Sequence, residues 1–129
     1  MIKFKYTIFY VQEVAKTIAF YENAFGFKRA FISPDNSYGE LNTGETTLSF
    51  ASVELAKTNL SGGFTESDLK EKVFGMEIGL TTDDVNKTVQ SAIDAGATLL
   101  ELAKTKPWGQ EVAYVRDPDG FLIEICTPM

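Results

Sequence analysis

The stretch "EVAKTIAFYENAFGF", residues 13–27, gives the clearest indication of the fold. Its apolar residues recur at spacings of four, three and four: Val14, Ile18, Tyr21 and Phe25. This is the stripe of an amphipathic helix that lies on a sheet. Gly26 follows as a helix stop, and the residues up to Ile32 resume as a strand. The stretch therefore predicts a helix followed directly by a strand.

The same stripe returns 71 residues later, at Val85, Val89 and Ala92, after a run of N-cap residues, "TTDD". Strands are expected around both helices, at Lys3–Val11, Phe27–Ile32, Tyr38–Asn42, Thr46–Ser52, Phe74–Thr82, Glu111–Arg116 and after the turn "DPDG". The repeat predicts an α+β fold of two βαβββ modules in one domain, residues 1–129. Module 1 is placed at about 1–53 and module 2 at about 74–129. The connector, about 54–73, is expected to contain a short helical turn after Thr65.

Composition excludes several classes of function. The chain has 129 residues, 44% of them hydrophobic, and no apolar run as long as the roughly 20 residues of a membrane span. The N-terminus lacks the apolar segment of a signal peptide, so we expect a cytoplasmic protein without a membrane partner. The net charge of −6 and the absence of Lys/Arg clusters argue against nucleic acid. The single cysteine, Cys126, is interpreted as a small buried hydrophobe.

Strand alternation divides each strand into a helix-facing and an open set. A four-stranded sheet with one helix leaves its other face open, and two such modules are expected to form a cleft between their open faces. The residues expected to face the cleft are Tyr6, Ile8, Tyr10, Thr47, Ser49, Ala51, Glu77, Gly79, Thr81, Leu122, Glu124 and Cys126.

Two segments resemble the glyoxalase, bleomycin resistance protein and extradiol dioxygenase superfamily, whose members are also called vicinal oxygen chelate (VOC) proteins. They are "YTIFYVQEVAKTIAFYENAFGF", residues 6–27, and "PWGQEVAYVRDPDGFLIEI", residues 107–125. The resemblance implies paired modules in a curled, mixed eight-stranded sheet with the helices outside, usually as a homodimer. It also implies, in the enzymes, a metal held by up to four side chains. The matching positions here are Tyr6, Ser49, Glu77 and Glu124.

The chain departs from those enzymes in its metal ligands. It has no histidine, and a neutral tyrosine is a poor ligand because its pKa is about 10. Extradiol dioxygenases need two histidines and a carboxylate, so the absence of histidine argues against that activity on chemical grounds. We therefore predict no metal cofactor. If a divalent metal binds, Glu77 and Glu124 would hold a hard cation such as Mg²⁺ or Ca²⁺ weakly.

The first interpretation of the function is a metal-independent small-molecule binding protein with a degraded metal site. A carboxylate pair beside aromatic rings suits a flat cationic ligand, and a cationic aromatic drug is one candidate. The expected ligand-binding residues are Tyr6, Tyr10, Ser49, Glu77, Trp108 and Glu124. Lys104 and Lys106 complicate this interpretation because either could pair with a glutamate.

The alternative is a lyase or isomerase of the lactoylglutathione lyase (glyoxalase I) type that uses Glu77 and Glu124. Paired carboxylates can share a proton, so Glu124 is the candidate general base. Structural interpretations stand beside both hypotheses. Glu124 could be a relic paired with Arg or Lys, and Trp108 a packing residue. Turn roles are expected for Asp117 and Asp119, and surface or strand-pairing roles for Tyr114 and Arg116.

Overall fold

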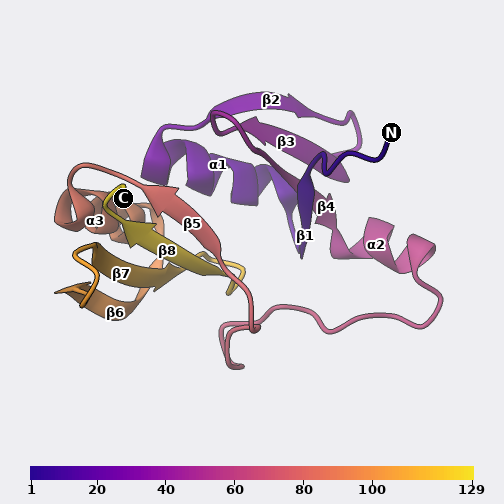
Figure 1. The fold of residues 1–129 in the computed structure, drawn as a ribbon. Helices are drawn as coiled ribbons and strands as arrows, with labels where there is room; N and C mark the ends of the chain where they lie inside the picture. Colours follow the sequence, from indigo (N-terminus) through magenta and orange to yellow (C-terminus); the bar gives the residue numbers. More distant parts are fainter. The chain divides into compact units, whose positions relative to one another are not determined.

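The computed structural model describes residues 1–129, which divide into two compact units (Figure 1). The first unit contains Met1–Glu22 and Gly26–Glu66, and the second contains Asn23–Phe25 and Ser67–Met129. Each unit contains one four-stranded sheet. None of the three helices is long and apolar enough to cross a membrane.

The first sheet is built from β1 (Thr7–Val11), β2 (Lys28–Ile32), β3 (Tyr38–Asn42) and β4 (Thr47–Ser52). Its order is β1-β4-β3-β2, with β1 parallel to β4 and the other pairs antiparallel. Helix α1 (Val14–Phe25) ends where Gly26 adopts a φ of 72°, a conformation that glycine adopts without the Cβ penalty. Helix α2 (Val53–Asn59) follows β4 directly.

Close packing of α1 on its sheet forms the core of the first unit. The predicted stripe residues Val14, Ile18 and Tyr21 expose 1% of their surface or less, and Phe50 of β4 exposes none. Burying side chains of this size contributes about 1.5–3 kcal/mol each. The helix approaches so closely at Gly39 that a Cβ there would collide with Ile18 Cδ1. The face of this sheet that carries Gly39 is therefore the helix face.

The second sheet repeats this topology with β5 (Ile78–Thr81), β6 (Thr98–Thr105), β7 (Glu111–Arg116) and β8 (Leu122–Cys126), in the order β5-β8-β7-β6. Strand β5 is parallel to β8. Helix α3 (Val85–Ala95) packs against β6, β7 and β8. As predicted, it begins after an N-cap: Asp84 Oδ1 accepts the N–H of Lys87 at 3.1 Å. Ile123 and Ile125 are fully buried on the helix face.

The α+β class and the two βαβββ modules are confirmed, with the eight strands divided between two four-stranded sheets. The first strand of each module is shorter than expected, because β1 begins at Thr7 and β5 at Ile78. A single hydrogen-bonded turn does follow Thr65, with the Glu71 N–H donating to the carbonyl of Asp68 at 3.0 Å. Helix α2 was not predicted, and Ser52 caps it by accepting the N–H of Leu55 at 3.0 Å. The cleft, the homodimer and the module bounds stay predictions.

Candidate functional site

Each sheet has a second face, opposite its helix. We call the one that carries Tyr6, Ile8, Tyr10, Tyr38, Glu40 and Ser49 the module-1 face. The module-2 face carries Glu77, Gly79, Tyr114, Glu124 and Cys126. Strand alternation and register assign these residues, because their chain neighbours Phe9, Phe50, Ile123 and Ile125 are buried on the helix faces. Four of the six predicted ligand-binding residues lie at corresponding positions of the two modules. Tyr6, just before β1, corresponds to Glu77, just before β5, and Ser49 on β4 corresponds to Glu124 on β8.

Glu77 and Glu124 come together on the module-2 face. Glu77 immediately precedes β5, and Glu124 in β8 pairs with Gly79 of β5. Glycine leaves room for the glutamate, since a Cβ at Gly79 would lie 3.5 Å from Glu124 Oε2. Partial burial raises the pKa of Glu77 above its ordinary value of 4.5, and the charge of Glu124 raises it further. The predicted carboxylate pair is therefore present in the fold.

No basic side chain neutralises this pair. The ion pairs of the structure are Lys16–Glu13, Arg29–Glu22 and Lys57–Glu66. None of them includes Glu77, Glu124, Lys104 or Lys106. The interpretation of Glu124 as a relic paired with Arg or Lys is therefore wrong in this structure.

Tyr114 lies beside the carboxylates, where sequence reasoning had not placed it. It pairs directly with Glu124 across β7 and β8. Burial raises the pKa of its hydroxyl, and the charges of Glu77 and Glu124 add to the effect. Strand alternation applied to β7 would have found Tyr114, because it shares a face with its cross-strand partner.

Cys126 lies on the same face, one alternation step beyond Glu124. It is buried, as predicted. Burial, followed by the charges of Glu124 and Glu77, raises the pKa of the thiol above its ordinary value of 9.0. The thiol therefore stays protonated near neutral pH, and a protonated thiol is a poor nucleophile.

Trp108 is a fixed aromatic surface in the second unit. Its indole N–H donates to Gln110 Oε1 at 2.7 Å, and the Gln110 amide donates to the carbonyl of Thr127 at 2.8 Å. The indole therefore has a defined hydrogen-bonded position, while 64% of the residue remains exposed. Such exposure is inconsistent with a role in core packing.

Arg116 is buried, so the expected surface role was wrong, although it does pair with Leu122 in the sheet. Its guanidinium donates to four main-chain carbonyls: those of Asp68 at 3.0 Å, Leu69 at 3.4 Å, Glu71 at 2.8 Å and Gly120 at 2.9 Å. Arg116 thus attaches the segment just before β5 to the turn before β8. The turn role of Asp117 is confirmed, since its carboxylate accepts the N–H groups of Asp119 and Phe121.

The module-1 face has a different arrangement. Tyr6 is 47% exposed just before β1, while Tyr10 packs edge-on against Phe64 with ring centroids 4.8 Å apart. Ser49 is fully buried. On β3, the Tyr38 hydroxyl donates to Glu40 Oε2 at 2.8 Å. Tyr38 and Glu40 were not among the predicted site residues, although Glu40 pairs directly with Ser49.

The donors present do not fit the metal of the related enzymes. No group of three or more His, Cys, Asp and Glu side chains is placed to hold an ion. Two carboxylates lie together on the module-2 face, whereas catalytic zinc sites use three protein ligands. A tyrosine and a buried serine occupy the other two positions that the resemblance implies.

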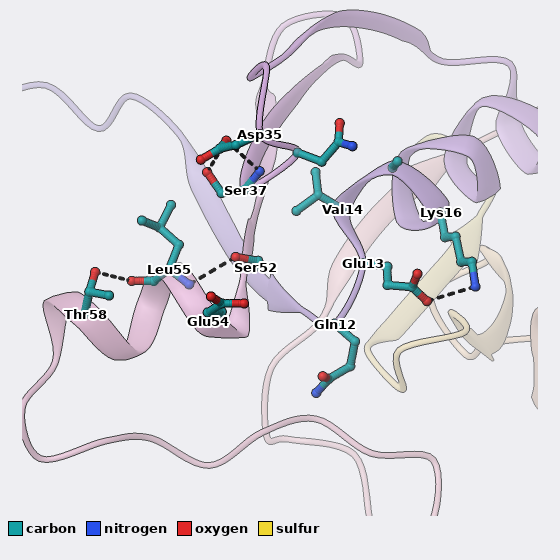
Figure 2. Close-up of a pocket in the computed structure, with 12 residues that line it drawn as sticks. Gln12, Glu13, Val14, Lys16, Asp35, Ser37, Ser52, Glu54, Leu55 and Thr58 are labelled. Carbon is teal, nitrogen blue, oxygen red and sulfur yellow. Dashed lines mark hydrogen bonds and ion pairs between the residues drawn. The ribbon is translucent and has the colours of Figure 1, made fainter.

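A cavity of about 530 Å³ lies in the first unit, near the N-termini of α1 and α2 (Figure 2). Most of its polar side chains are already used by local structure. Glu13 pairs with Lys16 at 2.9 Å, Asp35 accepts the Ser37 hydroxyl at 2.7 Å, and Ser52 caps α2. We therefore assign no ligand to this cavity.

Comparisons with known proteins agree with this fold. The family model described as Glyoxalase/Bleomycin resistance protein/Dioxygenase superfamily matches residues 3–125. The lactoylglutathione lyase GLX1 of Arabidopsis thaliana is 30% identical over 128 residues, covering 95% of this chain and 43% of the plant protein. The chain thus spans less than half the length of this relative. A probable lactoylglutathione lyase of Vibrio parahaemolyticus is 28% identical over 127 residues, covering 93% of this chain and 86% of that protein.

Two solved structures have the same fold. A glyoxalase-related enzyme from Fulvimarina pelagi superposes with a TM-score of 0.82 at 19% identity, covering 99% of this chain and 89% of that one. A family enzyme from Burkholderia phytofirmans gives a TM-score of 0.79 at 24% identity, covering 97% and 98% of the two chains. At these identities the likeness concerns the fold alone.

Proposed function

The chain belongs to the glyoxalase/bleomycin resistance protein/dioxygenase superfamily, and from this premise we propose that it binds a small organic cation without the help of a metal. The ligand class is a flat aromatic cation. We further propose that the protein is a cytoplasmic homodimer with no nucleic-acid or membrane partner. A glyoxalase-like role is the family-level expectation, and cation binding is the specific proposal for this chain.

The carboxylate pair of the module-2 face carries the proposal. Glu77 and Glu124 are close enough for one charge to raise the pKa of the other, and no ion pair in the protein compensates them. A bound cation would relieve this repulsion and return the pKa of Glu77 toward its ordinary value. The pair therefore favours a positively charged ligand.

Aromatic side chains supply the second part of the recognition. Tyr114 lies directly across the strands from Glu124, and a cation over a tyrosine or tryptophan face gains about 0.5–2 kcal/mol. The exposed indole of Trp108 offers a flat surface for a planar ligand. Tyr6, Tyr10 and Ser49 remain the proposed contacts from module 1.

The test is a titration with a planar aromatic cation, acridine orange, and a neutral planar control, acridone. Binding is followed by isothermal calorimetry and by quenching of Trp108, the only tryptophan. We expect the cation to bind and the E77Q/E124Q double variant to lose about tenfold in affinity, which corresponds to about 1.4 kcal/mol. Salt should weaken binding to the wild-type protein.

The matched control is E45Q/E71Q, which removes two exposed carboxylates that take part in no ion pair. It changes the net charge by the same amount and should leave affinity within about twofold, since distant surface charges are screened. Equal affinity of E77Q/E124Q and wild type for every cationic probe would sink the proposal.

A lyase or isomerase of the lactoylglutathione lyase type is the second candidate. Two similar proteins carry that name, and the raised pKa of Glu77 suits a general base that takes a proton from carbon. The carbanion would delocalise onto the neighbouring carbonyl oxygen, where the Tyr114 hydroxyl is the available donor.

The assay for this candidate is turnover of the methylglyoxal–glutathione hemithioacetal, alone and with Ni²⁺, Zn²⁺, Mn²⁺ or Mg²⁺. We expect no turnover. Turnover that disappears in E77Q but persists in E45Q would favour the lyase over the binding protein. Elemental analysis of protein purified without an affinity tag provides a separate check, because stoichiometric metal would contradict metal-independent binding.

A further inference from the structure

Ser49 has an unusual environment for a hydroxyl group. The residue is fully buried in the middle of β4, and its Oγ is the one buried side-chain polar atom in the protein without a hydrogen-bond partner. A hydroxyl in this state has lost its bonds to water without a replacement, and such groups in native proteins call for an explanation.

The neighbours of Ser49 suggest what that explanation is. Ser49 pairs with Ile8 on one side and with Glu40 on the other. The Tyr38 hydroxyl donates its proton to Glu40 Oε2 at 2.8 Å. Burial raises the pKa of Tyr38, and Glu40 raises it further, while the nearby Ser49 hydroxyl acts in the opposite direction. Tyr38 thus lies between two acceptors and has one proton to donate.

We propose that Tyr38, Glu40 and Ser49 form a second ligand subsite, on the module-1 face, in which an ammonium group binds Glu40 and the released Tyr38 hydroxyl turns to Ser49 Oγ. This inference rests on the proposed function for the class of ligand, and it assigns residues that the carboxylate pair of module 2 does not include. Binding replaces the hydrogen bond from Tyr38 to Glu40 with two others, one from the ammonium group to Glu40 and one from the Tyr38 hydroxyl to Ser49 Oγ. The buried Ser49 hydroxyl then has a hydrogen-bond partner.

Charge and ring contacts around the subsite favour a cation. Arg29, on the neighbouring edge strand β2, is already paired with Glu22. Lys28, also on β2, lies across from Asn42 and forms no ion pair with Glu40. The ring of Phe31 packs against Tyr38 with centroids 5.8 Å apart, so the carboxylate lies next to an aromatic pair. A single carboxylate suits an alkylammonium group, whereas a Ca²⁺ ion takes six to eight oxygen ligands.

The experiment titrates the folded full-length protein with phenethylammonium and, as the neutral control, phenethyl alcohol. Affinity and the chemical shifts of the β3 and β4 amides are measured by NMR. We expect E40Q to weaken phenethylammonium binding about tenfold, E45Q to leave it unchanged, and the alcohol to bind weakly to all variants. Shifts confined to residues outside β3 and β4 would overturn the subsite.

The proton exchange has its own test, a cycle of S49A, Y38F and the double variant. S49A should weaken phenethylammonium binding about threefold in the wild-type background, because the released hydroxyl then has no acceptor. It should have no effect in the Y38F background, which has no hydroxyl to release. Equal effects of S49A in both backgrounds would refute the exchange, since a merely structural role of Ser49 does not depend on Tyr38.

Comparison with the module-2 variant separates this inference from the proposed function. If E77Q/E124Q loses affinity and E40Q does not, the subsite is wrong and the carboxylate pair stands. If E40Q loses affinity and E77Q/E124Q does not, the ligand binds module 1 and the pair is wrong. Both ideas fail if neither variant changes the binding of either cation.

Discussion

Replacement of Arg116 with methionine should destabilise the protein strongly. Methionine keeps most of the aliphatic volume and removes the guanidinium, so the carbonyls of Asp68, Leu69, Glu71 and Gly120 lose their donor. The bond to Gly120 is buried, and hydrogen bonds to charged groups are worth about 1.5–3 kcal/mol. The other three bonds are partly buried, and water can replace the donor when the segment loosens.

We therefore expect a total loss of about 3–5 kcal/mol in the free energy of unfolding. In a domain of this size the melting temperature should fall by about 10–15 °C. Urea unfolding followed by circular dichroism measures the first quantity and a thermal scan the second. The control is R29M, because Arg29 is half-exposed and its single ion pair with Glu22 should be worth less than about 1 kcal/mol.

A local measurement tests the structural reason. The Glu71 amide donates to the carbonyl of Asp68, and the Gly120 amide donates to the carbonyl of Asp117. Hydrogen exchange at Glu71 and Gly120 should accelerate in R116M more than exchange in β3 and β4. A loss below about 1 kcal/mol, or unchanged exchange at both amides, would show that Arg116 does not hold the segment before β5.

Three further predictions concern packing, the unpartnered hydroxyl and pH. G39A should lose about 1–3 kcal/mol in chemical denaturation, because its Cβ would collide with Ile18 Cδ1 on α1, whereas G62A, in open space, should not. S49A should raise the free energy of unfolding by about 1 kcal/mol, because it removes a buried hydroxyl that has no partner; a lower urea midpoint would contradict this. The raised pKa of Glu77 stabilises the protein below pH 4.5, and this contribution is lost as pH rises through the folded-state pKa. The urea midpoint of E77Q relative to wild type should therefore rise across that window and then level off, and a pH-independent difference would be inconsistent with the shift.

The parts of the fold that sequence predicted are those with a local, repeated pattern. The stripes that begin at Val14 and Val85 lie on helices of 12 and 11 residues, so their period identifies helices without tertiary information. Helix α2 has only seven residues, too few for a period to stand out, and Ser52 is both the end of β4 and the N-cap. Because the strand pattern of β4 continues up to Ser52, the sequence gives no separate signal for the start of α2.

In the candidate site, too, local pattern predicted some features and nonlocal contacts decided others. Strand alternation placed Glu77 and Glu124 on one face because the faces of a strand follow from its sequence alone. The burial of Arg116 could not be predicted, since it depends on the main-chain path of residues 68–71, more than 40 positions away. Whether a charged side chain in a strand lies in water or under a connector is decided by that nonlocal contact.

The two modules distribute a tyrosine and a carboxylate differently over their strands, and this difference has a consequence for binding: Tyr38 and Glu40 both lie on β3, whereas Tyr114 lies on β7 and Glu124 on β8. In module 1 the carboxylate is on β3, where Tyr38 already donates to Glu40, so a ligand must displace an internal bond. In module 2 Glu124 is on β8 beside Gly79, where module 1 has Ser49 beside Ile8. A second carboxylate, Glu77, adds repulsion that a cation relieves. The module-2 pair should therefore contribute more of the affinity, with Glu40 adding selectivity for ligands that carry a second N–H donor.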